Sequence, residues 1–132
     1  MSQIVTVPVQ SHYYQFDQQG VAFNMWYLAF LEQARNGYLA ARGFSLEDLL
    51  ASGHDIQLVH VEIDWSCALR YGDPIAIDVS RARVGTTSFT LRYALAVQGQ
   101  VGATAAAVYV IVDASIEGKA PLPPGLRAAL EQ

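Results

Sequence analysis

The spacing of apolar residues predicts a long buried helix in the first third of the chain. Residues 24–42 contain no proline, and apolar side chains lie on nearly every side of the expected helix at its start. A helix that is apolar all round has to be buried. Gly43 suits the end of this helix. Ser45 suits the N-cap of a short second helix, with Asp48 at the capping-box position and Gly53 at its end.

A first strand and a loop are predicted ahead of the long helix. β-Branched and aromatic residues favour strands, and they are frequent at the start of the chain: Ile4, Val5, Val7, Val9, His12, Tyr13 and Tyr14. We therefore expect a first strand that includes these residues. Residues 15–20 are polar and end in glycine, which predicts a loop.

Beyond Gly53 the pattern changes to an alternation of apolar and polar residues, which predicts strands. One strand has Val59, Val61, Ile63 and Trp65 on one face and His60, Glu62 and Asp64 on the other. Turns at residues 72–74 and 84–87 separate this strand from two more, around residues 75–79 and 89–93.

The last strand is predicted to be a central one. Residues 101–112 follow a hairpin at 98–100, are rich in alanine and valine, and carry no charge. Such a strand is expected to be covered on both faces or paired with another subunit. Pro121, Pro123 and Pro124 end the sheet. Residues 125–132 are so few that we expect any terminal helix to be marginal.

This order of elements predicts an α+β fold in which one sheet covers one helix. We expect a single domain over residues 1–132, with a curved antiparallel sheet of about five strands wrapped around the long central helix. Trp65, Tyr71, Tyr93 and Tyr109 are expected on the outer face of the sheet, where an aromatic patch usually marks an interface. A homodimer or homotetramer is therefore expected.

The charge of the chain argues against some partners. It has 132 residues, a formal net charge of -4, and eight scattered Lys and Arg residues that form no basic stripe for a nucleic acid backbone. Residues 1–10 lack the features of a signal peptide, and no apolar stretch is long enough for a membrane span. We therefore expect a cytoplasmic protein that binds no nucleic acid.

Cysteine and histidine give no sign of a metal site. Cys67 is the single cysteine, so it forms no internal disulfide, and we expect it to be a small buried hydrophobic residue. His12, His54 and His60 lack the spacing of metal ligands. No metal or other cofactor is expected.

The most informative segment is residues 13–35. An aromatic stretch leads to an aspartate, then two residues and a glycine, and then a helix with a tyrosine, an acidic residue and an arginine: Asp17, Gly20, Tyr27, Glu32 and Arg35. This segment resembles the signature of the 4-hydroxybenzoyl-CoA thioesterase and YbgC-like family. The likeness continues more weakly through residues 84–89 and the last strand. It implies a hotdog fold and hydrolysis of an acyl-CoA or acyl-carrier thioester.

The chemistry of thioester hydrolysis accounts for these residue types. An ionised Asp17 can attack the carbonyl carbon or activate a water molecule, and the sequence does not decide between the two. Backbone N–H groups at the helix start, near Asn24 and Met25, are expected to form the oxyanion hole. A structural interpretation stands beside the catalytic one, because aspartate also commonly bonds to loop and helix N–H groups.

The remaining candidates are substrate-binding residues: Tyr13, Gly20, Tyr27, Glu32, Thr86, Thr87 and Ser88. Arg81 and Arg83 lie close enough in sequence to that turn to meet CoA phosphates with it. Each candidate also has a structural interpretation. Tyr27 suits the core, Glu32 with Arg35 suits a solvated helix pair, and a polar turn needs no ligand.

Two positions depart from the family pattern. Gln15 replaces a frequent acidic residue, and Asn24 stands where YbgC-like members carry histidine. Gln15 is expected to hold a water molecule or a backbone group. The departures keep open a non-catalytic acyl-CoA-binding module. A hotdog hydratase or dehydratase is the other alternative, and it ranks lower because residues 20–26 contain no histidine.

Overall fold

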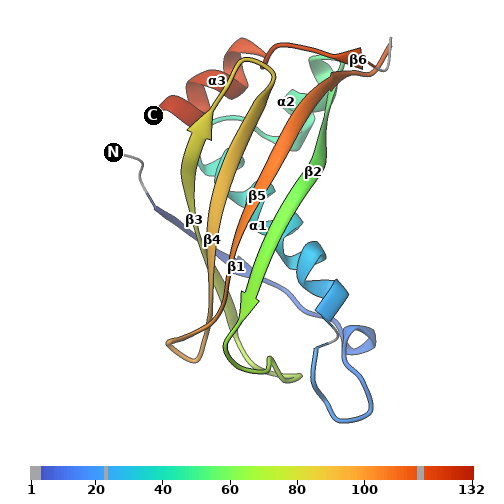
Figure 1. The fold of residues 1–132 in the computed structure, drawn as a ribbon, viewed down its shortest axis with the longest axis vertical. Helices are drawn as coiled ribbons and strands as arrows, with labels where there is room; N and C mark the ends of the chain where they lie inside the picture. The colour runs from blue at the N-terminus through green and yellow to red at the C-terminus, as the bar shows by residue number, and fades with distance from the viewer. Residues whose placement is uncertain (1–3, 23, 116–117) are drawn as a thin grey trace.

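A curled antiparallel sheet wraps one long helix in the computed structural model of the protein (Figure 1). The structure describes residues 4–22, 24–115 and 118–132. Residues 1–3 of the N-terminal segment, and Phe23 of the segment 13–35, therefore lie outside the described residues. The main strands are β1 (Val5–Val9), β2 (His54–Trp65), β3 (Ile75–Val84), β4 (Ser88–Val97) and β5 (Gln100–Asp113). Their order across the sheet is β1-β3-β4-β5-β2, and the two-residue β6 (Gly118–Lys119) pairs with β5.

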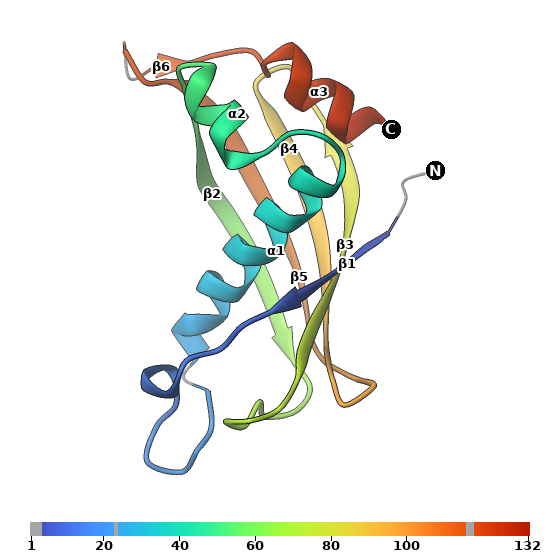
Figure 2. The same ribbon diagram turned by 180° about the vertical axis from the view of Figure 1, so that it is seen from behind.

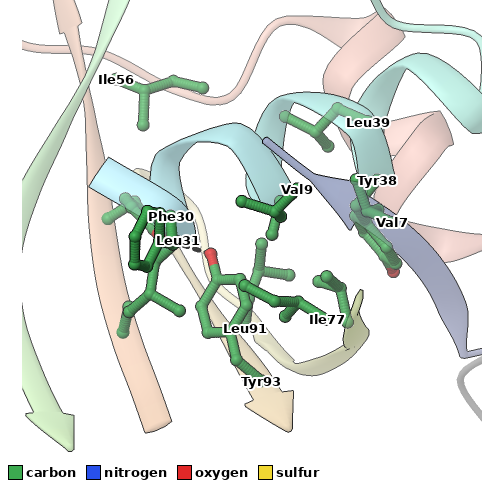
Figure 3. Packing of buried hydrophobic residues seen from close by; sticks show 14 of the residues in the cluster. Val7, Val9, Phe30, Leu31, Tyr38, Leu39, Ile56, Ile77, Leu91 and Tyr93 are labelled. Carbon is green, nitrogen blue, oxygen red and sulfur yellow. Dashed lines mark hydrogen bonds between the residues drawn. The ribbon is translucent and has the colours of Figure 1, made fainter. Parts of the chain in front are cut away.

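The long helix lies on the concave side of this sheet (Figure 2). A 3₁₀ turn, η2 (Asn24–Trp26), leads into α1 (Tyr27–Ala41). Phe30, Ala34 and Tyr38 on α1 are completely buried against the sheet. Figure 3 shows this helix packed over Ile77 and Leu91 of the sheet. The predicted α+β arrangement is confirmed, although the helix start is less buried than expected, because Met25 is 64% exposed.

The register of the strands corrects the prediction for two tyrosines. On β4, the residues from Phe89 to Val97 alternate, and every odd-numbered one is buried toward the helix. Tyr93 belongs to that row, and Tyr109 of β5 pairs with Phe89 on the same face. Tyr93 and Tyr109 are therefore core residues, and their placement on the outer face was wrong. Trp65 is exposed, but it packs on Tyr27 of α1 on the helix side of the sheet, so its placement on the outer face was also wrong. Tyr71 is exposed and lies in the segment between β2 and β3, not on a face of the sheet.

Strand β5 lies between β4 and β2, which confirms the predicted central strand. Strand β2 is longer than expected, and its alternation is broken by a register shift between Leu58 and His60. Val59 falls at this irregularity and is exposed, whereas Val61 and Ile63 face the helix and are half-buried. Within the described residues β2 pairs with β5 alone, so its outer edge is unpaired.

The first strand is shorter than predicted. Strand β1 ends at Val9, and Tyr13–Gln15 form a 3₁₀ turn instead of continuing it. The buried side chain of Gln15 explains this difference, because its Oε1 atom accepts the backbone N–H of His12 at 2.8 Å and closes the turn. Gln15 thus holds a backbone group, one of the two roles expected for it.

The two short helices differ in how well local sequence predicted them. The reciprocal hydrogen bonds of Ser45 and Asp48 begin α2 (Leu46–Ala51), as expected. The terminal helix α3 (Pro124–Glu131) is well formed, so its description as marginal was wrong. It buries Leu126 and Leu130, and arginines from elsewhere in the chain bind its last carbonyl groups. Arg81 donates to Leu130 O at 2.9 Å, and Arg42 donates to Gln132 O at 3.2 Å.

Candidate active site

Asp17 lies in a tight loop at one end of the sheet. Its Oδ1 atom accepts the backbone N–H groups of Gln19 at 2.9 Å and Val21 at 3.2 Å. Gly20 has a φ of 74°, which a side chain would strain, and its N–H donates to Asp17 O at 3.0 Å. The carboxylate therefore has the expected structural role through one oxygen. No hydrogen bond to the other oxygen is found among the described residues, and the side chain is exposed.

A distant part of the chain holds this loop in place. The segment that joins β2 to β3 runs beside it, with Ala22 N–H donating to Leu69 O at 2.7 Å. Tyr71 N–H donates to Gly20 O at 2.9 Å, and an isolated bridge pairs Val21 with Arg70. These bonds fix the chain shortly before the helical segment, since η2 begins at Asn24 and α1 at Tyr27.

A groove opens beside the start of the helix. It has a volume of about 300 Å³, and its lining includes Asn24 and Tyr27 from the helix side and Trp65 and Cys67 from the sheet side. Asn24 and Met25 are in the first turn of this helical segment, where N–H groups have no partner within the helix. Asp17 does not line the groove; its loop borders the groove through Val21. The structure thus brings Asn24 and Tyr27 together and leaves Asp17 at the rim.

Tyr27 combines a core position with a place in this groove. It is buried and packs edge-to-face on Phe30 and Trp65. Burial raises the pKa of the Tyr27 hydroxyl, while a backbone hydrogen bond at Leu69 and the nearby Cys67 act as smaller influences of opposite sign. The hydroxyl is therefore neutral at physiological pH. Tyr27 also lines a second, almost wholly apolar cavity under α1 with Leu31 and Ile63.

Glu32 and Arg35 form the expected pair, but it is not a solvated one. Arg35 donates to both carboxylate oxygens of Glu32, at 3.2 and 2.8 Å. The Arg35 side chain is only 7% exposed, against 49% for Glu32. Its guanidinium lies 5.2 Å from the centre of the Tyr109 ring, which is within range of a cation–π contact. Glu32 is thereby fixed at the surface of α1 by an arginine that belongs to the core.

The predicted substrate-binding turn lies at the other end of the sheet. Thr86, Thr87 and Ser88 follow β3, whereas the Asp17 loop contacts residues 69–71, which precede it. Strand β3 has ten residues and spans about 30 Å. Figures 1 and 2 both place the β3–β4 turn beside α3 and the loop after β1 at the opposite end. One chain therefore does not bring this turn to Asp17.

Two further sequence predictions change in the structure. Arg81 is engaged with α3 rather than free for phosphates. Cys67 is exposed in the groove, so its description as a buried residue was wrong. The cause is the end of the strand: Cys67 follows β2, where its N–H donates to Gly102 O at 3.2 Å and its side chain leaves the alternating pattern of the strand. Tyr13 is 77% exposed and lies outside the groove lining.

Sequence reasoning missed the part of the groove made by residues 65–68. Nothing in this stretch resembles a motif, and it reaches the helix start through the Trp65–Tyr27 ring contact and through the long-range bonds of the neighbouring residues 69–71 to residues 20–22. The one available signal was the loss of alternation after Trp65, which marks the end of a strand.

Comparison with known proteins gives the family. The sequence model of the thioesterase-like superfamily matches residues 14–130. A 1,4-dihydroxy-2-naphthoyl-CoA hydrolase from Synechococcus elongatus is 26% identical over 117 residues, which cover 87% of this chain and 86% of that protein. A 1,4-dihydroxy-2-naphthoyl-CoA thioesterase from Synechocystis has a TM-score of 0.86 at 22% identity, over 98% of this chain and 97% of that one. A Staphylococcus aureus protein solved in complex with CoA has a TM-score of 0.86 at 12% identity, over 99% and 84%.

The chain belongs to the thioesterase-like superfamily. The predicted hotdog fold and family are confirmed by this match and by the structural likeness over nearly the whole chain. The predicted class of enzyme, a thioester hydrolase, is confirmed with them. No helix of the described residues is both long and apolar enough to cross a membrane.

Proposed function

We propose that this protein hydrolyses acyl-CoA thioesters at the groove beside the start of α1, with Asp17 as the catalytic carboxylate. The carrying observation is the arrangement around residues 17–27. Asp17 has one oxygen engaged and the other without a hydrogen bond among the described residues, and its loop borders a groove that Asn24 lines from the first turn of the helical segment. A structure of similar fold that was solved in complex with CoA supports acyl-CoA as the proposed substrate.

The proposed reaction begins at the carbonyl carbon of the thioester. The Oδ2 atom of Asp17 either attacks this carbon or removes a proton from a water molecule that attacks it. The carbonyl oxygen then carries negative charge, and the N–H groups of Asn24 and Met25 donate to it. When the carbon–sulfur bond breaks, the CoA thiolate leaves. Direct attack produces an anhydride with Asp17, which water hydrolyses to the acid.

The acyl group is proposed to lie in the groove of about 300 Å³, against Tyr27 and Trp65. The apolar cavity under α1 has a volume of only about 10 Å³, which is room for one water molecule, so an acyl group does not enter it as it stands. Aromatic acyl groups are the first candidates, because the Synechococcus relative is named for a naphthoyl-CoA substrate. A cytoplasmic location stays a prediction.

A second copy of the chain is proposed to complete the site. The unpaired edge of β2 carries exposed apolar side chains on its helix-facing side, including Leu58 at 36% and Trp65 at 46% exposure. Unpaired edges of this length favour pairing with another chain. If two copies of β2 pair antiparallel, opposite ends of the two sheets meet. The partner's turn at Thr86, Thr87 and Ser88 is then brought toward Asp17, which one chain alone does not achieve.

The test is thiol release from a panel of aliphatic and aromatic acyl-CoAs by the wild type and by Asp17→Asn. The amide keeps the size of the side chain and still accepts the loop hydrogen bonds through its oxygen, so folding should survive. We expect the variant to lose at least about a hundredfold in kcat, which is the lower end for removal of a general base. Near-normal turnover by Asp17→Asn would refute the assignment. A wild type that binds acyl-CoA without releasing thiol would instead favour the binding-module alternative.

A further inference from the structure

We propose that a second groove, centred on Arg70, binds the phosphate groups that follow the pantetheine arm of coenzyme A. This inference rests on the proposed acyl-CoA hydrolysis and adds the residue that holds the polar end of the substrate. The second groove has a volume of about 340 Å³ and is lined by Cys67, Ala68, Arg70, Asp73, Val97, Gln98 and Gln100.

The two grooves adjoin each other. The groove at the helix start and the groove at Arg70 share Cys67 and Ala68 as lining residues. A ligand whose thioester lies at Asn24 therefore has a path over these two small side chains toward Arg70. The flexible pantetheine arm of coenzyme A joins the thioester to the phosphates in the same order. The lining changes along this path, since the second groove is much more polar than the first.

Arg70 is the one Lys or Arg at this end of the described molecule. Arg35 pairs with Glu32, while Arg42 and Arg81 bind carbonyl groups of α3. Arg127 donates to Gly85 O and pairs with Glu131. Arg83 and Lys119 lie near the far ends of β3 and β5, and Arg92 is exposed on the outer face of the sheet. A polyanionic substrate held at Asp17 therefore meets a single cation of the same chain.

The backbone of Arg70 is fixed, and its side chain is available. Its N–H donates to Asp73 Oδ2 at 2.9 Å, and the bridge to Val21 ties it to the Asp17 loop. Asp73 Oδ1 accepts from Gln98 at 3.1 Å, so both oxygens of this neighbouring carboxylate are engaged. Arg70 is exposed, and its guanidinium has no partner among the described residues. A planar guanidinium is well suited to two parallel hydrogen bonds with a phosphate.

Cys67 offers a direct measurement of occupancy. It is the single cysteine of the chain, it is exposed, and it lines both grooves. The rate of its alkylation by iodoacetamide is measured with increasing desulfo-CoA, which has no thiol to exchange, and with pantetheine analogues that lack phosphate. We expect desulfo-CoA to protect Cys67 in the wild type. In Arg70→Ala, the desulfo-CoA concentration for half protection should be at least about tenfold higher. Protection by the phosphate-free analogue should be weak and equal in both proteins.

The controls separate the phosphate contact from general effects. Arg92→Ala removes an equal charge from the outer face, so its Cys67 should be protected by the same desulfo-CoA concentration as in the wild type. Arg70→Lys should need a concentration between those of the wild type and Arg70→Ala. Circular dichroism confirms that each variant is folded. Protection that is absent in the wild type, unchanged in Arg70→Ala, or as strong with the phosphate-free analogue would overturn the proposal.

Kinetics distinguish this proposal from the proposed function. Arg70→Ala should raise KM for an acyl-CoA by about tenfold or more at unchanged kcat, and leave hydrolysis of the matching N-acetylcysteamine thioester unaltered. If Arg70→Ala lowers the turnover of both substrates equally, the role of Arg70 is refuted and the proposed function is not. If the wild type hydrolyses neither substrate, the proposed function fails, while the Cys67 protection still reports whether the groove binds phosphate.

Discussion

The hydroxyl groups of Tyr93 and Tyr109 hydrogen-bond to each other in the core beneath α1. The two residues lie on adjacent strands but in different rows, because Tyr93 pairs with Ala105 and Tyr109 with Phe89. Leu91 and Ala107 occupy the row between them, so the tyrosines lean toward one another over a small side chain. Burial is the main cause that raises the pKa of both hydroxyls, most strongly for Tyr93.

This pair predicts a loss of stability in alkali. The folded state binds these protons more tightly than the unfolded state, whose tyrosine pKa is near 10.0. The stabilising contribution is therefore complete below pH 10 and is lost as the pH rises above it. The free energy of unfolding in urea should be level between about pH 7 and 9 and fall beyond pH 10. Tyr93→Phe with Tyr109→Phe should make that fall shallower. Leu91→Val, a destabilised control, should keep the wild-type slope.

Gly37 of α1 predicts an unusual substitution effect. A β-carbon at this position would lie 2.5 Å from Cγ1 of Val7 on β1. Gly→Ala in a helix normally stabilises by about 1 kcal/mol. Here the clash should reverse the sign, and we expect Gly37→Ala to lower the free energy of unfolding by about 1–3 kcal/mol. The double variant Gly37→Ala with Val7→Ala should lose less free energy of unfolding than the two single variants lose together. Simple additivity in chemical denaturation would contradict the close contact.

The terminal helix should contribute strongly to stability. Leu130 is completely buried, so Leu130→Ala is expected to cost about 2–5 kcal/mol. Ala128 on the same helix is exposed, and Ala128→Ser should change the free energy of unfolding by no more than about 0.5 kcal/mol. Equal, small effects in both variants would mean that the helix is as marginal as its length suggests.

The unpaired edge of β2 predicts a dimer, and a charged side chain placed on this edge should disrupt it. Lysine on an edge strand opposes pairing with another chain, so Leu58→Lys is expected to shift the protein from dimer toward monomer and to reduce turnover. Ala128→Lys, on the exposed side of α3, is the matched charge control and should remain dimeric. Sedimentation velocity gives the result, and a wild type that is monomeric at all concentrations would refute the proposed pairing.

Local features of the fold were predictable, and long-range ones were not. The Ser45–Asp48 capping box and the α1 boundary at Gly43 depend on neighbours in sequence. The alternation on β4 puts Tyr93 in one row with Phe89 and Leu91, so its core position was readable from the sequence and was missed. On β5 apolar residues occupy both faces, so alternation did not identify which face holds Tyr109. Similarly, Asp17 and its loop were recognisable, but the groove wall at Cys67 depends on hydrogen bonds between residues that are more than thirty positions apart.

The pairing of β2 also has a consequence for how the chain reaches its native state. Trp65 pairs with Ala103 and His54 with Asp113, so β2 stays without its neighbour until β5 has been made and positioned. Contacts between such distant segments slow folding, whereas α1 needs only local bonds. During this interval both edges of a strand with one apolar face are open to other molecules. Refolding yield should therefore fall as protein concentration rises, with β2 as the segment most prone to aggregation.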